Sequence, residues 1–76
     1  MDPAQFRRNL EEALYLQAGT LKGGEVLADL AVWDSVDIIG FIAMADEKYG
    51  VIIPESRIPK SPTVEELAGL IEVFST

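Results

Sequence analysis

Apolar side chains near the start of the chain recur every three or four residues, which is the spacing of one face of a helix. They are Phe6, Leu10, Ala13 and Leu14. This stripe predicts a helix from Pro3 to about Gln17, with Asp2 as its cap and Gly19 as its end in the left-handed conformation. The charged side chains of the segment are predicted to face water and to form weak pairs along the helix: Arg7 with Glu11 and Arg8 with Glu12.

A second helical pattern begins at Ser35, runs to Tyr49 and is apolar on two sides. The stripe predicted to face the core consists of Ile38, Phe41, Ile42, Ala45 and Tyr49. The stripe on roughly the opposite side consists of Val36, Ile39, Gly40 and Ala43, edged by Asp37, Asp46 and Glu47. A domain of this size rarely buries a helix all round, so the second stripe is predicted to be exposed at least in part. An exposed apolar stripe with an acidic edge indicates a docking surface for a partner.

The start of this central helix has the pattern of a reciprocal cap. The Asp34 side chain precedes the helix and accepts a backbone N–H of its first turn, and Asp37 stands three positions later to complete the cap. Ser35 then occupies the first helical position. Its hydroxyl faces free N–H groups and the positive end of the helix dipole, which is where an attached phosphate is best tolerated.

The connection between these two helices contains several turn-forming glycines. Residues 18–33 are predicted to form a long irregular loop, which Val26, Leu27 and Leu30 would anchor in the core. Trp33, at the end of the loop, is interpreted as a buried or half-buried wedge that fixes the loop against the helices, with a recognition role as the alternative.

The chain after the central helix returns to the core and ends in a third long helix. Gly50 ends the central helix, Val51, Ile52 and Ile53 pack against the core, and Glu55–Ile58 leaves room for only a short helical turn. Thr63 and Glu66 form a capping box for the last helix. The core stripe of that helix consists of Val64, Leu67, Ala68 and Ile71, with Phe74 closing it. We therefore predict an all-α four-helix bundle with three main helices, one short third helix and a long first loop, formed by residues 1–76 as a single domain.

The charge of the chain is strongly acidic and unevenly distributed. Its 76 residues carry a net charge of −7. Residues 1–33 contain three basic and five acidic side chains, and residues 34–76 contain three basic and eight acidic ones, so most of the excess lies in the half that carries Ser35. This balance argues against a nucleic-acid partner, which needs a basic surface, and favours proteins that present Arg and Lys.

The chain contains no Cys and no His. Disulfides, thiolate metal sites and imidazole acid–base chemistry are therefore excluded, and a self-contained hydrolase or transferase is not expected. No apolar run approaches the roughly 20 residues that span a bilayer, and the residues at the amino terminus do not have the pattern of a secretion signal. These features predict a cytoplasmic, monomeric, non-enzymatic protein without a metal site.

Residues 27–71 resemble an acyl carrier protein. Asp34–Ser35–Val36 is similar to the Asp-Ser-Leu motif that opens the second helix of that family. The acidic, apolar helix after it leads to Tyr49, Gly50 and Val51 and then to Ile53 and Pro54, a helix exit that the family shares. Thr63–Leu67 resembles the start of the family's last helix. The motif, the helix and its exit are more specific together than an Asp-Ser pair alone.

The resemblance implies a function for the central helix. Ser35, next to Asp34, would receive a 4'-phosphopantetheine arm from coenzyme A through a phosphopantetheinyl transferase, and the thiol of the arm would hold acyl groups as thioesters. The chain would then carry intermediates of fatty-acid, polyketide or related specialised biosynthesis. The exposed stripe and its acidic edge would bind acyl-loading and acyl-processing enzymes through their basic patches. Ile53 and Ile58 would line the entrance for the acyl chain.

Three residues depart from the family pattern. Val36 replaces the usual Leu of the motif. Gly40 stands where many members have Glu, so one acidic contact for partner enzymes is lost. A role of Gly40 in close packing is an alternative. Trp33 replaces a small residue of housekeeping fatty-acid carriers and is more familiar in carriers of specialised pathways. The alternatives are an aminoacyl or peptidyl carrier for nonribosomal synthesis or D-alanylation, an unmodified helical protein-interaction domain, and a bundle that binds a small molecule.

Overall fold

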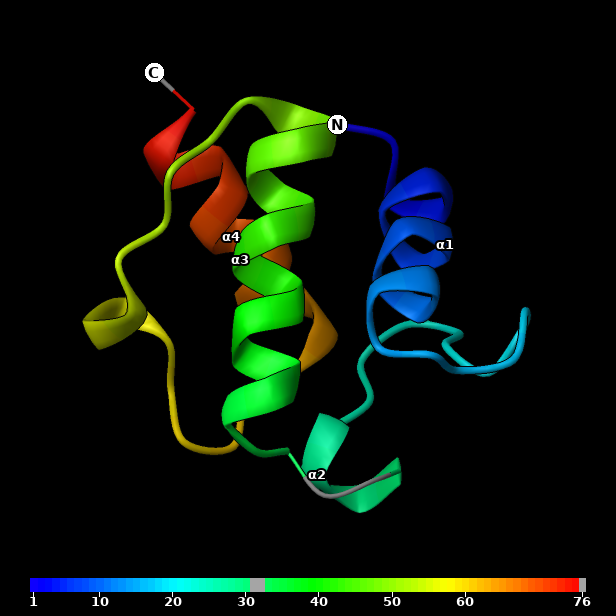
Figure 1. Cartoon of the computed structure of the whole chain (residues 1–76). Coiled ribbons are helices and arrows are strands. Elements are labelled where there is room, and N and C mark those ends of the chain that lie inside the picture. The colour runs from blue at the N-terminus through cyan, green and yellow to red at the C-terminus, as the bar shows by residue number, and fades with distance from the viewer. Residues whose placement is uncertain (31–32, 76) are drawn as a thin grey trace.

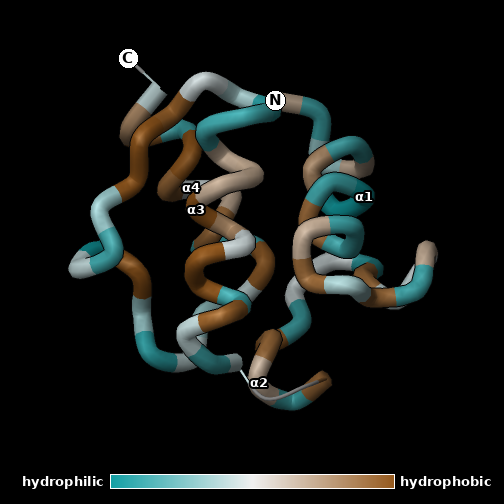
Figure 2. Tube along the Cα trace, viewed as in Figure 1, coloured by the Kyte–Doolittle hydropathy of each residue, from teal (hydrophilic) through white to brown (hydrophobic). Residues whose placement is uncertain are grey.

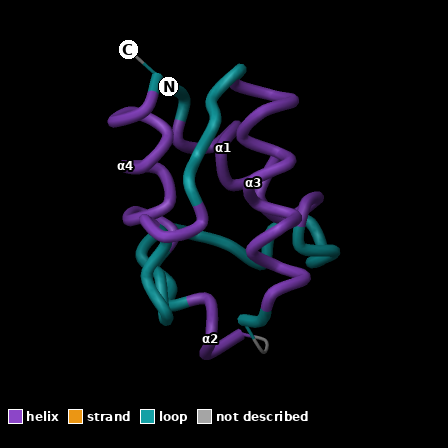
Figure 3. Tube along the Cα trace, turned by 60° about the vertical axis from the view of Figure 1, so that its left-hand side comes forward, coloured by secondary structure: helices purple, strands orange, loops and turns teal. Residues whose placement is uncertain are grey.

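Three long helices surround the core of the protein, and two short helical segments lie in the connections between them (Figure 1). The computed structural model describes residues 1–30 and 33–75. The long helices are α1 (Pro3–Ala13), α3 (Ser35–Tyr49) and α4 (Val64–Phe74), and the short segments are α2 (Leu27–Leu30) and the 3-10 turn η1 (Glu55–Arg57). Helices account for all the regular structure of the described residues apart from one isolated bridge (Figure 3). The predicted all-α bundle is confirmed.

The core lies where α1, α3 and α4 face one another. α1 packs against α3 and α4, and all three helices contain hydrophobic residues (Figure 2). The buried apolar side chains are Phe6, Leu10, Leu21, Leu27, Phe41, Met44, Ala45, Val51, Ile53, Val64, Leu67 and Ile71. One hydrogen bond and one aromatic contact join α1 to the end of α3: the Asn9 side chain donates to the Tyr49 hydroxyl at 3.0 Å, and the centroids of the Phe6 and Tyr49 rings lie 6.2 Å apart.

The end of α1 differs from the prediction. The helix was expected to continue to Gln17 and to end at Gly19, but it stops at Ala13 with Leu14 as its C-cap. Tyr15 takes the left-handed conformation, at φ 59°. Its N–H donates to the Glu12 carbonyl and the Leu16 N–H donates to the Glu11 carbonyl, which is the Schellman pattern with Tyr in the usual place of Gly. Gly19 also has a positive φ but lies in the following loop.

Glu11 was predicted to face water, and this prediction is wrong. Its side chain is 4% exposed, and its carboxylate accepts a 2.8 Å hydrogen bond from the Leu21 N–H. Because α1 ends at Ala13, the chain turns back along the helix and brings Leu21, itself buried, over Glu11.

The long first loop is less irregular than predicted. Val26 and Thr63 form an isolated antiparallel bridge, in which the Leu27 N–H donates to the Pro62 carbonyl and the Val64 N–H to the Glu25 carbonyl. The predicted anchor Leu27 is buried and begins α2, whereas the predicted anchor Leu30 is 41% exposed, at the end of α2. Residues 31 and 32 of the predicted loop lie outside the described residues.

The segment after α3 alternates between the core and the solvent. Val51 and Ile53 are buried as predicted, but Ile52 between them is 70% exposed. Successive side chains of an extended backbone point to opposite sides, so only two of the three can reach the core. The predicted short turn is present as η1, where the Arg57 guanidinium lies 5.2 Å from the centre of the Phe74 ring.

The last helix follows the prediction closely. The Thr63 side chain accepts the Glu66 N–H and the Glu66 carboxylate accepts the Thr63 N–H, which completes the capping box. Three residues of the predicted stripe are buried, namely Val64, Leu67 and Ile71, and Ala68 and Phe74 are partly buried against them. Of the helices in the described part of the chain, none is both long enough and apolar enough to cross a membrane.

Candidate functional site

The start of α3 carries the predicted reciprocal cap. One carboxylate oxygen of Asp34 accepts the N–H groups of Val36 at 3.0 Å and Asp37 at 3.2 Å, and the Asp37 carboxylate accepts the Asp34 N–H at 3.3 Å. This arrangement fixes the first turn through local contacts alone. Ser35 lies between the two capping residues as the first residue of α3.

The Ser35 side chain is exposed at this helix start. Asp34 before it and Val36 after it are exposed as well, so the hydroxyl stands on an open part of the surface. The α3 dipole places its positive end here, and Gly50 closes the opposite end at φ 65°. An incoming electrophile or a covalently attached group can therefore reach the Ser35 oxygen from solvent.

The predicted docking stripe lies mainly on the surface. Val36 is 67% exposed and Ile39 is 63% exposed. The other exposed members of the stripe and its acidic edge are Ala43, Asp46 and Glu47, and the half-buried members are Asp37 and Gly40. Two large apolar side chains in solvent, one and four residues after Ser35, match the predicted exposure of this stripe.

Gly40 is the member of the stripe that contacts another helix. A Cβ atom built on Gly40 would lie 3.0 Å from the carbonyl oxygen of Ala13, the last residue of α1. The helix backbones therefore approach closely at this point. Gly40 is therefore closely packed against α1 inside the protein.

The core-facing stripe of α3 is correct in outline but incomplete. Phe41 and Ala45 are fully buried, and the remaining predicted members are half-buried: Ile38, Ile42 and Tyr49. Met44 is 5% exposed and was not predicted to face the core. It follows Phe41 by three residues, so a wider apolar face would have included it.

Trp33 is half-buried, which agrees with the predicted buried or half-buried wedge. It packs against the core cluster, while its indole Nε1 is buried and has no hydrogen-bond partner among the described residues. The Trp33 ring therefore contributes apolar contacts rather than a hydrogen bond.

Tyr15 is a surface residue that the sequence pattern did not single out. It is 92% exposed, and it lines the same hollow as Gly40 and Ala43 of the stripe. The predicted helix through Gln17 hid its position, and no local signal marks a Tyr for the left-handed conformation.

The described residues contain no group of three or more carboxylate, imidazole or thiolate side chains that could hold a metal ion. A family comparison gives the decisive observation: the model of the phosphopantetheine attachment site matches residues 4–71, from α1 to α4. This chain belongs to the phosphopantetheine-attachment family. Comparisons with curated proteins and with solved structures returned no significant match.

Membership defines the cofactor and the general role of the protein. Domains of this family are attachment sites for 4'-phosphopantetheine, so the chain is a phosphopantetheine carrier protein. Such carriers are not themselves catalysts, and they interact with phosphopantetheinyl transferases and with biosynthetic enzymes.

The helix start at Ser35 fits this group in chemical terms. Attachment needs an accessible hydroxyl, and the Ser35 side chain is exposed. A phosphodiester there would lie at the positive end of the α3 dipole, which favours a negative charge by about 0.3–1 kcal/mol. The cap leaves Ser35 free, because the Asp34 and Asp37 side chains bond to backbone N–H groups and to no atom of the hydroxyl.

Proposed function

We propose that the protein is an acyl carrier that is modified on Ser35, works as a monomer, and forms a single carrier domain over residues 1–76. The Ser35 oxygen would attack the β-phosphorus of coenzyme A in the active site of a phosphopantetheinyl transferase. The new oxygen–phosphorus bond replaces the pyrophosphate bond, adenosine 3',5'-bisphosphate leaves, and the hydroxyl proton passes to a base of the transferase. The chain contains no His or Cys, so the transferase supplies the acid–base groups.

The exposure of Ser35 at the first position of α3 is the observation that carries this proposal. The arm supplies the thiol that this cysteine-free chain lacks, and acyl groups would travel on it as thioesters. Everything else that the chain contributes is binding and positioning.

The exposed stripe beside Ser35 supports a docking role. Val36 and Ile39 offer apolar area to a partner, and the net charge of −7 would attract basic surfaces from a distance. Electrostatic attraction of this kind raises the rate of encounter more than the lifetime of the complex. That balance suits a carrier that must leave one enzyme for the next.

The acyl cargo is proposed from the family resemblance and from the segment after α3. Ile53 is buried and Ile58 is partly buried, on the two sides of η1. An apolar chain entering the bundle beside η1 would contact both side chains. An aminoacyl cargo would make less use of such a route.

Loading experiments test the cargo directly. The protein carrying the arm would be offered to an acyltransferase with acyl-coenzyme A and, separately, to an amino-acid-activating enzyme with ATP. Acyl thioester formation with the first enzyme alone supports the proposal. Thioester formation with the second enzyme alone would replace it with an aminoacyl carrier.

A further inference from the structure

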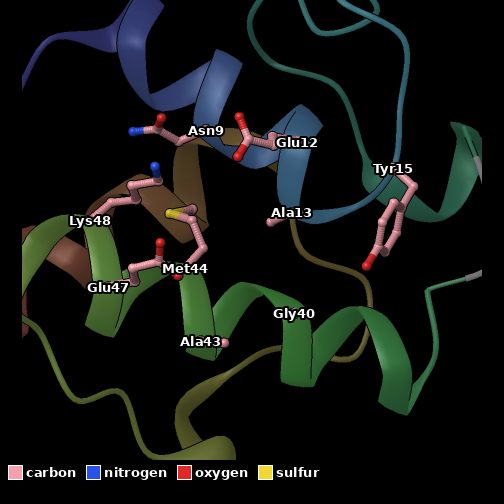
Figure 4. A pocket seen from close by; sticks show the side chains of 9 residues that line it. All are labelled: Asn9, Glu12, Ala13, Tyr15, Gly40, Ala43, Met44, Glu47 and Lys48. Atoms are coloured by element: carbon pink, nitrogen blue, oxygen red, sulfur yellow. The ribbon is translucent and has the colours of Figure 1, made fainter.

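A groove of about 220 Å³ runs between α1 and α3 on the side of the exposed stripe (Figure 4). Its middle is formed by Ala13, Gly40 and Ala43, which contribute at most a methyl group each. The groove is narrow at this point, because the Gly40 backbone comes close to the Ala13 carbonyl. The docking stripe is therefore bordered by a second helix.

Both walls of the groove carry an exposed carboxylate. Glu12 comes from α1 and Glu47 from α3, while Lys48 and Asn9 lie near Glu47 at the end away from the start of α3 (Figure 4). Lys48 offsets the charge of Glu47 on the α3 wall, so the groove keeps a net negative charge through Glu12. Small apolar residues beside that carboxylate suit a side chain with an aliphatic stem and a positive head. Arginine has this form, and it pairs with carboxylates through several N–H groups.

The opposite end of the groove is marked by the Tyr15 ring (Figure 4). Tyr15 is 92% exposed, so its ring contributes almost nothing to the core. Its φ of 59° is uncommon for a residue with a Cβ atom, and Gly would adopt that conformation without strain. An exposed aromatic side chain kept in a strained backbone indicates a role in binding rather than in folding. The face of a Tyr ring attracts a guanidinium group.

The position of the groove indicates which partner reaches it. Gly40 lies five residues after Ser35, about 7.5 Å along the helix axis. A transferase must bring its active site to the Ser35 oxygen itself, because no arm is yet present to span a distance. It must therefore cover the first turns of α3 and the groove beside them.

We propose that the α1–α3 groove receives an arginine side chain of the phosphopantetheinyl transferase, so that Glu12 and Tyr15 of the α1 end are part of the docking surface. This proposal rests on the modification of Ser35 proposed above. It adds α1 to a surface that the sequence placed on α3 alone.

The rate of modification tests the proposal, with coenzyme A and a broad-specificity phosphopantetheinyl transferase acting on the full chain. Tyr15→Gly and Glu12→Gln should each lower kcat/KM by about three- to tenfold. Tyr15→Gly relieves backbone strain, so this variant should be at least as stable as the wild type while it is modified more slowly. A folding defect would change both quantities in the same direction.

Glu72→Gln is the matched control, because it removes the same charge from an exposed position on α4, outside the groove. It should change kcat/KM by less than about twofold. If Tyr15→Gly and Glu12→Gln both behave like Glu72→Gln while the wild type is modified, the groove proposal is overturned and the proposed function stands. If the wild type is not modified at all, both proposals fail.

Discussion

The backbone N–H of Leu21 donates a 2.8 Å hydrogen bond to the carboxylate of Glu11, ten residues earlier, and the Glu11 side chain is 4% exposed. This contact ties the first loop to α1. Glu11→Ala would leave a buried N–H without a partner, so it should lower the free energy of unfolding by about 1–3 kcal/mol. Glu11→Gln keeps an acceptor oxygen and should cost less. Urea unfolding followed by the fluorescence of Trp33, the only tryptophan, measures both values.

Glu12→Ala is the control for this prediction, because Glu12 is exposed on the next position of α1. It should leave the free energy of unfolding nearly unchanged. Equal losses for Glu11→Ala and Glu11→Gln would show that the hydrogen bond to Leu21 is not what stabilises the loop.

Glu25 makes stability depend on pH. Its carboxylate accepts the N–H groups of Lys22 and Gly23, and these bonds lower the pKa of Glu25 below its ordinary value. The bonds therefore stabilise the folded state above that ordinary value. The stabilisation is lost as the pH falls toward the lower pKa of the folded state, because the unfolded chain takes up the proton first.

Glu25→Gln should therefore reduce the loss of unfolding free energy between pH 7 and about pH 4. Urea unfolding at the two pH values measures that loss. Glu72→Gln removes an equal charge without touching the turn at Lys22, and it should keep more of the wild-type pH dependence. An unchanged pH dependence in Glu25→Gln would contradict the role of this turn.

Gly40 and Gly69 are both inside helices but have different surroundings. A Cβ atom on Gly40 would lie 3.0 Å from the Ala13 carbonyl oxygen, whereas one on Gly69 would have no neighbour within 4 Å. Ala in place of Gly ordinarily stabilises a helix by about 0.5–1 kcal/mol. Gly69→Ala should show that gain in thermal or urea unfolding, and Gly40→Ala should show less or a loss. Equal gains at both positions would mean that α1 moves away from Gly40 without cost.

Two substitutions distinguish the contribution of the Asp34 cap hydrogen bonds to stability from the contribution of the Asp34 charge. Asp34→Ala removes the acceptor of the Val36 and Asp37 N–H groups and should lower the free energy of unfolding by about 0.5–2 kcal/mol. Asp34→Asn keeps an acceptor oxygen and should lose less than half as much. If Asn destabilises the protein as much as Ala, the charge rather than the cap is what stabilises the helix start.

The parts of the fold that sequence reasoning predicted are those determined by local chemistry. The caps at Asp34 and Thr63 and the left-handed end at Gly50 depend on residues within one helical turn, so α3 began and ended where predicted and α4 began where predicted. The end of α1 depends on a contact with a residue outside the helix, because the Leu21 N–H donates to the Glu11 carboxylate. It also requires Tyr15 to adopt the left-handed conformation, which is unfavourable for Tyr. No pattern of nearby residues signals such a choice.

The candidate site also has features that the sequence predicted and features that it did not. The position of Ser35 and the exposure of Val36 and Ile39 follow from helical periodicity and from the cap. The groove does not, because it depends on which helix packs against Gly40. Tyr15 could be assigned to the same surface only after the end of α1 was known.

Ser35 is proposed to be the attachment residue of the phosphopantetheine arm. The most direct measurement is the intact mass after incubation with coenzyme A and a phosphopantetheinyl transferase, followed by peptide mapping. The wild type and Ser56→Ala, which removes an exposed serine of η1, should each gain one phosphopantetheinyl group on the peptide that contains Ser35, and Ser35→Ala should gain none. No gain in the wild type, or an equal gain in Ser35→Ala, would contradict attachment of the arm at Ser35.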